Sequence, residues 1–106
     1  MSKTTISTQP VKGMRDFFPE EMRIRNWLFS KWRRVAHRFG YEEYDACVVE
    51  AEELYTRKAG DEIVGQLYNF ADKGERKVAL RPEMTPSLAR MVMSRGKGQA
   101  LPARWF

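Results

Sequence analysis

The 106-residue sequence is poor in cysteine and has no long apolar run. Cys47 is the only cysteine, so no disulfide forms within the chain, and a reducing compartment such as the cytoplasm is expected. No apolar run approaches the roughly 18 residues that a membrane-spanning helix needs, so no membrane partner is expected. The first ten residues are polar and rich in Ser and Thr, which excludes a secretory signal and predicts a disordered tail over residues 1–10.

The sequence also lacks the motifs of several kinds of catalytic site. Its glycines do not have the spacing of a P-loop or of a dinucleotide-binding loop. No serine beyond the tail has a histidine beside it in sequence, so a nucleophilic triad is unsupported. His37 is the only histidine, has no Cys or His neighbour at metal-ligand spacing, and is expected to be an ordinary surface residue. Catalysis by these residues alone is not expected.

Positive charge is in modest excess, because 19 Lys and Arg residues against 14 Asp and Glu residues give a net charge of +5. This excess is compatible with an anionic partner, but it is too small to indicate nucleic-acid binding by itself. Hydrophobic residues make up 42% of the chain and aromatic residues 12%, which is enough for a modest core. The length allows one domain or a piece of one.

The strongest periodic pattern lies between residues 19 and 39 and predicts a helix of about five turns. Pro19 and the two glutamates after it are typical of a helix start, and Gly40 is typical of a C-terminal cap. Apolar side chains recur every three or four residues and form one stripe: Ile24, Trp27, Leu28, Trp32, Val35, Ala36 and Phe39.

Four arginines lie largely off this apolar stripe: Arg23, Arg33, Arg34 and Arg38. A basic helix face of this kind can follow an RNA backbone through phosphate contacts. Solvated basic faces are far commoner, so a small RNA-binding domain is kept only as an alternative function. RNA binding without salt dependence would exclude that alternative, since phosphate contacts release counterions.

Downstream of this helix the sequence predicts a strand followed by a short helix. Residues 41–49 alternate and end in a β-branched pair, which indicates a strand with Cys47 in its apolar part. Residues 50–58 predict a short helix that closes near Gly60. Residues 61–65 are expected to form a loop.

A β-hairpin is predicted next. Residues 66–71 alternate polar and apolar side chains, residues 72–75 have the composition of a turn, and residues 76–80 are strand-like again.

The second hairpin strand runs directly into residues 81–85, which read Arg-Pro-Glu-Met-Thr and are called the 81–85 motif below. Pro82 pushes the residue before it towards extended geometry, so the strand is expected to stop there. Thr85 followed by Pro86 is typical of a helix start, with Thr85 as the N-cap, and the helix is expected to run to about residue 94. Its inward face is expected to carry Leu88, Ala89, Val92 and Met93.

The 81–85 motif holds a carboxylate, Glu83, and a hydroxyl, Thr85, at a strand-to-helix junction. That junction is a suitable place to hold the cationic group of a small ligand. The alternative is that Glu83 only favours the first helical turn by its charge and that Thr85 only caps the helix. Local chemistry alone favours this simpler alternative.

Three stretches, in this order, resemble the histidyl-tRNA synthetase family. Residues 12–20 resemble the N-terminal signature of that family, and residues 39–50 resemble motif 1 of class II synthetases with the end of its long helix. Residues 67–85 resemble the hairpin and the first histidine-binding motif of the family. Trp105 and Phe106 would then enter the motif 2 strand, so the resemblance covers nearly the whole chain.

The resemblance implies an α+β fold, the N-terminal portion of the class II synthetase antiparallel-sheet catalytic domain, with a long motif 1 helix and a β-hairpin. Residues 11–106 would form this partial catalytic domain, which stops before motif 2. The resemblance also implies a homodimer through the motif 1 region. Cys47 stands where the family usually has a proline, a difference that would loosen the dimer-forming strand.

The family activates L-histidine with ATP and Mg²⁺ and transfers it to tRNA(His), so the resemblance implies these ligands and partners for the complete enzyme. It implies that Glu83, Met84 and Thr85 bind the substrate histidine, while Arg81 helps to hold their loop. The ATP-binding arginine of motif 2 would lie beyond Phe106. The 106-residue chain alone is therefore expected neither to activate histidine nor to charge tRNA, and no catalytic residue or metal ligand is assigned within it.

Two further alternatives stay open beside this resemblance. The regulatory subunit of ATP phosphoribosyltransferase, in histidine biosynthesis, has the same ancestral fold without ligase activity. The complete 81–85 motif favours the enzyme over this subunit. The chain acting by itself as a dimerising module is the other alternative, and equilibrium sedimentation tests it.

Overall fold

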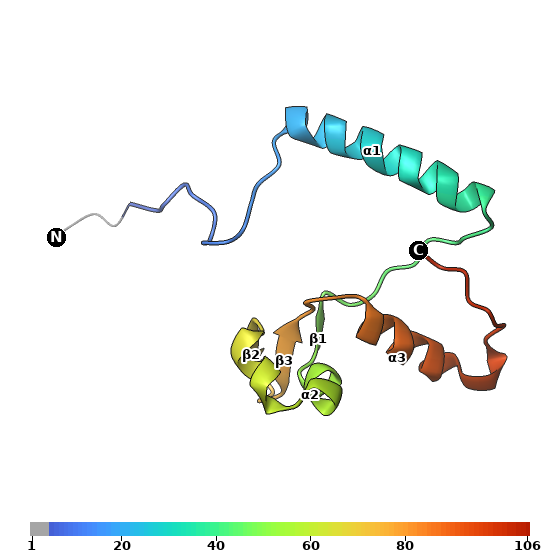
Figure 1. Cartoon of the computed structure of the whole chain (residues 1–106). Coiled ribbons are helices and arrows are strands. Elements are labelled where there is room, and N and C mark those ends of the chain that lie inside the picture. Colours follow the sequence, from blue (N-terminus) through green and yellow to red (C-terminus); the bar gives the residue numbers. More distant parts are fainter. Residues whose placement is uncertain (1–4) are drawn as a thin grey trace. The chain divides into compact units, whose positions relative to one another are not determined.

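The structure is a computed structural model that describes residues 5–106, apart from the side chains of residues 58, 59 and 61 (Figure 1). The described residues form two compact units, one that ends at Glu42 and one that spans Glu43–Phe106. Residues 5–10 are exposed and contain no helix or strand, whereas residues 1–4 lie outside the described part, so the disordered tail over residues 1–10 stays a prediction. None of the described helices is long and apolar enough to cross a membrane.

The first unit is built around one helix, α1, which spans Pro19–Arg38 (Figure 1). Pro19 lies in the first turn, where its missing N–H costs no hydrogen bond. Glu20 and Glu21 lie in the same turn, at the positive end of the helix dipole. The predicted start of the helix is therefore confirmed.

The C-terminal end of α1 is a Schellman cap. Gly40 has φ +78°, a left-handed conformation that glycine adopts without a steric penalty. Its amide donates to the carbonyl of His37 at 3.0 Å, and the amide of Tyr41 donates to the carbonyl of Ala36 at 2.9 Å. These two hydrogen bonds satisfy carbonyls that the end of the helix would otherwise leave open. The predicted glycine cap is confirmed.

The apolar stripe of α1 is exposed. Ala36 is the only buried residue among those of α1, whereas Trp27 and Trp32 are each 61% exposed. Ile24 and Leu28 are also more than half exposed. The predicted period is correct, but the described residues of the first unit do not cover the stripe. An exposed apolar face of this extent is typical of an interaction surface.

The second unit contains a three-stranded antiparallel sheet (Figure 1). Its strands are β1 (Val49–Ala51), β2 (Asn69–Ala71) and β3 (Lys77–Leu80), in the order β1-β3-β2. In the centre of the sheet, Ala79 of β3 lies opposite Glu50 of β1 on one side and Asn69 of β2 on the other. The α+β fold class and the predicted hairpin are confirmed.

The strand predicted over residues 41–49 is wrong in position. The observed strand begins at Val49, and residues 43–48 precede it without helix or strand pairing. Cys47 is accordingly exposed and does not lie in an apolar strand. The physical reason is that a distant partner defines the strand: pairing with β3 begins at Val49, opposite Leu80, while in the segment before it the Tyr44 amide donates to the Phe106 carbonyl at 3.0 Å.

The predicted short helix exists, but it begins later than expected. Helix α2 spans Glu53–Ala59, because Glu50 and Ala51 belong to β1 instead. Gly60, with φ +79°, follows its end as predicted. The expected loop over residues 61–65 is instead a 3₁₀ helix, η1, which spans Asp61–Gln66.

The hairpin turn between β2 and β3 is organised by Asp72. Its carboxylate accepts hydrogen bonds from the amides of Gly74 and Arg76, each at 2.9 Å, and pairs with the Arg76 guanidinium at 2.7 Å. The backbone hydrogen bond from Arg76 is the main reason why the pKa of Asp72 lies below its usual value. The turn chemistry therefore stabilises the ionised aspartate.

The hydrophobic core of the second unit is small. It consists of Tyr55 on α2, Leu67 after η1 and Ala79 on β3, with Leu54 and Ile63 partly buried against it. Few apolar side chains of this unit are buried, and two of its buried residues, Glu50 and Ser87, are polar.

Helix α3 spans Thr85–Arg95 and is followed by a short 3₁₀ turn, η2 (Gly96–Gly98). Its inward face differs from the prediction. Ser87 is completely buried, whereas Met93 is 78% exposed and Ala89 is exposed as well. Leu88 and Val92 are partly buried, so the prediction was right for two of its four residues.

Candidate functional site

The 81–85 motif lies between the end of β3 at Leu80 and the start of α3 at Thr85, as predicted. Glu83 and Thr85 are exposed, while Met84 is half-buried between them in the chain. No hydrogen bond or ion pair joins the Glu83 carboxylate to another described residue. A carboxylate that is exposed and without a partner at such a junction is available to a cationic ligand group.

The predicted capping role of Thr85 is wrong. The residue before the helix is Met84, Thr85 is the first helical residue, and no side-chain hydrogen bond caps α3. The physical reason is that Met84 already has helical backbone angles (φ −93°, ψ −21°), which moves the helix boundary one residue earlier than the proline pattern suggests. The simpler alternative for Thr85, a purely structural cap, therefore loses its support.

Arg81 holds the motif to the segment before β1. Its Nη1 donates to the Ala46 carbonyl at 2.9 Å and to the Asp45 carboxylate at 3.2 Å, and its amide bonds to Val48. The amide of Ala46 and then Arg81 lower the pKa of Asp45 below its usual value. Arg81 thus has the holding role that was expected of it, and its guanidinium is occupied by these contacts.

Beneath the motif lies a buried polar cluster that the sequence did not predict. Glu50 on β1 is 6% exposed, and its Oε2 accepts hydrogen bonds from Ser87 Oγ at 2.8 Å and from Arg90 Nε at 3.0 Å. Glu50 is also the main reason why the pKa of Arg90 lies above its usual value. Ser87 and Arg90 are three residues apart on α3 and so share one face. That spacing was the available signal, but nothing in sequence pointed to Glu50 as the partner.

Tyr55 extends this cluster towards the motif. Burial raises the pKa of its hydroxyl, which the nearby Ser87 hydroxyl opposes; the charges of Glu50, Arg81 and Glu83 also act on it. Although Ser87 lies close enough to have this effect, no described atom has hydrogen-bonding geometry to the Tyr55 hydroxyl. Ser87 donates to Glu50 instead.

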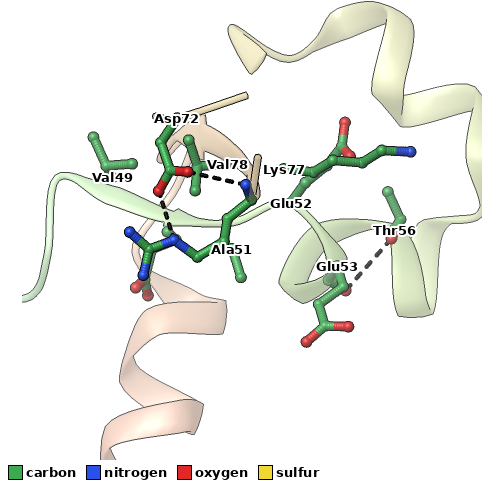
Figure 2. Close-up of a pocket in the computed structure, with 10 residues that line it drawn as sticks. Val49, Ala51, Glu52, Glu53, Thr56, Asp72, Lys77 and Val78 are labelled. Carbon is green, nitrogen blue, oxygen red and sulfur yellow. Dashed lines mark hydrogen bonds and ion pairs between the residues drawn. The ribbon is translucent and has the colours of Figure 1, made fainter. Parts of the chain in front are cut away.

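A hollow of about 550 Å³ lies elsewhere, over β1, β3 and α2 (Figure 2). Several of its charged groups have partners: Asp72 pairs with Arg76, and Glu52 accepts a hydrogen bond from Asn69 at 2.6 Å. Neither Glu83 nor Thr85 lines it. The hollow therefore does not include the 81–85 motif, although Glu50, the hydrogen-bond partner of Ser87, lines it.

Within residues 5–106, the His, Cys, Asp and Glu side chains that the structure describes form no group of three that could hold a metal ion. No step of a reaction is assigned to Mg²⁺ on this chain. His37 is exposed, as the sequence predicts.

Comparison with known proteins gives a consistent picture. A family model described as histidyl-tRNA synthetase matches residues 13–106. The chloroplastic/mitochondrial histidine–tRNA ligase of Arabidopsis thaliana is 57% identical over 95% of the chain. The chain spans less than a quarter of the length of the curated relatives that it matches.

Solved structures resemble the chain as well. A histidine–tRNA ligase subunit from Alicyclobacillus acidocaldarius is 30% identical, with a TM-score of 0.78 over 98% of this chain and 30% of that one. A Bacillus halodurans protein described as an ATP phosphoribosyltransferase regulatory subunit/histidyl-tRNA synthetase is 27% identical, with a TM-score of 0.77 over 96% of this chain and 27% of that one.

Proposed function

Because the chain belongs to the histidyl-tRNA synthetase family, we propose that it forms the histidine-binding part of a class II histidine–tRNA ligase. The complete enzyme would activate L-histidine with ATP and transfer it to tRNA(His). The observation that carries the proposal is the 81–85 motif, in which Glu83 and Thr85 are exposed and the Glu83 carboxylate pairs with no other described residue.

In this proposal the Glu83 carboxylate binds the α-ammonium group of histidine. Charge-assisted hydrogen bonds of this kind are short and directional, so they orient the substrate as well as bind it. The Thr85 hydroxyl, which caps no helix, supplies a second polar contact, and Met84 lies between the two in the same loop. Arg81 contributes indirectly, by holding the motif to the Asp45 carboxylate and the Ala46 carbonyl.

The ATP-binding half of the active site is proposed to come from residues outside this chain. Attack on a phosphoanhydride develops negative charge, which cationic groups placed around it must stabilise. The described residues place no such group beside Glu83 and Thr85, since Arg81 is bound to Asp45 and Arg90 is bound to Glu50. We therefore expect the 106-residue chain by itself to bind neither ATP nor Mg²⁺ productively.

The experiment that tests the proposal is histidine-dependent exchange of pyrophosphate into ATP, followed by charging of tRNA(His). The protein at its full encoded length is expected to perform both reactions, and the 106-residue chain neither. Pyrophosphate exchange by the 106-residue chain alone would overturn the proposal that the ATP-binding half of the active site comes from residues outside this chain. Histidine binding without exchange by the full-length protein would favour the regulatory-subunit alternative, for which the Bacillus halodurans structure is the supporting observation.

A homodimer is proposed through the motif 1 region. The exposed apolar stripe of α1 supports it, because Trp27 and Trp32 are each 61% exposed. Sedimentation equilibrium of the full-length protein at micromolar concentration is expected to show a dimer that Trp32→Asp dissociates, and a wild-type monomer would exclude this part of the proposal. The cytoplasm remains the proposed compartment, as the sequence suggested.

A further inference from the structure

The 81–85 motif is tied on both sides to one residue, Glu50. In the sheet, Glu50 pairs with Ala79, which lies just before the motif. Through its side chain, Glu50 accepts hydrogen bonds from Ser87, just after the motif, and from Arg90, one turn further along α3. A single residue of β1 therefore holds both the strand that enters the motif and the helix that leaves it.

These contacts are protected from water. Glu50 is 6% exposed and Ser87 is completely buried, so solvent does not compete for the 2.8 Å hydrogen bond between them. A buried carboxylate is a costly way to stabilise a fold, because apolar side chains of similar volume often stabilise as much or more. What a hydrogen-bonded carboxylate adds is a defined position for its partners.

The position that it defines is that of the first turn of α3. Thr85 is the first residue of that helix and Ser87 lies in the same turn, so fixing Ser87 fixes Thr85. Glu83 lies two residues before the helix, and no hydrogen bond joins its carboxylate to another described residue. The placement of Glu83 therefore depends on the two ends of the loop.

We propose that Glu50 is a positioning residue of the histidine site, which acts through Ser87 and Arg90 to hold the Glu83 carboxylate and the Thr85 hydroxyl in register with the substrate. This inference rests on the proposed function, because the substrate it concerns is histidine. Glu50 does not contact the substrate. Loss of the hydrogen bonds that Glu50 accepts from Ser87 and Arg90 weakens the binding of histidine and leaves the binding of ATP unchanged.

The test uses the protein at its full encoded length, with pyrophosphate exchange measured well below the melting temperature of every variant. Glu50→Gln and Ser87→Ala are expected to raise the KM for histidine by about 10- to 100-fold, the scale of a roughly 1 Å misplacement, with the KM for ATP unchanged. Arg90→Lys keeps the charge and is expected to stay close to wild type. Hydrogen exchange at the amide of Leu88, which donates to the Met84 carbonyl at 2.9 Å, is expected to speed up in the first two variants.

Two matched controls separate position from general destabilisation. Ser94→Ala removes an exposed hydroxyl from the same helix, and Glu53→Gln removes an exposed charge from the first turn of α2. Both are expected to leave the KM for histidine unchanged. If Glu50→Gln does not fold, the comparison of the single variants Ser87→Ala and Arg90→Lys provides the test.

The inference fails if folded Glu50→Gln or Ser87→Ala protein keeps the wild-type KM for histidine, or if the KM values for histidine and ATP rise together. The proposed function fails separately, if the wild-type protein shows no histidine-dependent exchange. In that case hydrogen exchange at the Leu88 amide still tests whether Glu50 holds the start of α3, and an unchanged rate in Glu50→Gln would overturn the inference.

Discussion

The two units of this chain become ordered by different means. Helix α1 and its cap use contacts within a few residues, and its apolar stripe is left exposed. The second unit has strands of only three or four residues, and contacts between distant residues hold it, such as Glu50 with Ser87 and Arg81 with Ala46. A strong local pattern thus produces a helix without a core, while the candidate site depends on long-range polar contacts.

The largest expected difference in stability between the two units comes from replacing one leucine by alanine in each of them. Leu67→Ala removes a side chain from the core of the second unit and is expected to lower the free energy of unfolding by about 2–4 kcal/mol. Leu28→Ala removes a side chain that is 54% exposed and is expected to cost less than about 1 kcal/mol in the 106-residue chain. Urea titration followed by circular dichroism measures both.

Equal losses from the two leucine variants would contradict the comparison, because they would mean that the stripe of α1 is buried in solution. A loss at Leu28 that grows with protein concentration would instead identify self-association as the source of that burial.

Replacing Gly40 or Gly60 by alanine is expected to destabilise the chain through backbone strain alone, since each has positive φ and no atom within 4 Å of an added Cβ. Gly60, with φ +79° and ψ −177°, lies in a region that other residues almost never adopt, so Gly60→Ala is expected to cost about 1–3 kcal/mol. Gly40→Ala in the cap of α1 is expected to cost about 1–2 kcal/mol. A clearly larger loss of unfolding free energy in Gly40→Ala than in Gly60→Ala would show that backbone strain at the substituted glycine does not decide the effect.

The smallest effect concerns pH and the hairpin turn. The folded-state pKa of Asp72 is lowered, so its contribution to stability is present above its unfolded pKa, near 3.8, and is lost as pH falls through the lower folded value. The carboxyl carbon of Asp72, followed by NMR, is expected to titrate below 3.8. Asp72→Asn should remove this part of the acid sensitivity, and an Asp72 that titrates at its usual value would refute the turn geometry.

Local signals predicted the parts of the fold that local chemistry determines. Pro19 and Gly40 bound α1 correctly, and the alternation around the turn at Asp72 located the hairpin. The same signals failed where distant residues decide the outcome. Strand β1 begins at Val49 because its pairing with β3 begins there, opposite Leu80, and no local pattern shows where a distant partner lies.

The sequence indicated which residues form the candidate site, but not the contacts that hold these residues in place. The strand-to-helix junction lies where it was expected, but by itself it favoured a structural role for Glu83 and Thr85, and the family resemblance is what predicts that they bind histidine. The inward turn of Ser87 was missed because apolar periodicity gives a serine no reason to be buried. Its partner, Glu50, lies on a different element and becomes visible only in three dimensions.

The central claim is that Glu83 binds the α-ammonium group of histidine. Its most direct test is calorimetric titration of the full-length protein with L-histidine and with imidazolepropionic acid, which lacks that group. Glu83→Gln is expected to weaken histidine binding by about 10- to 100-fold, as the loss of a charge-assisted hydrogen bond of about 1.5–3 kcal/mol predicts, and to leave the analogue unaffected. The control Glu53→Gln should change neither. Equal weakening of both ligands, or of neither, would contradict the account.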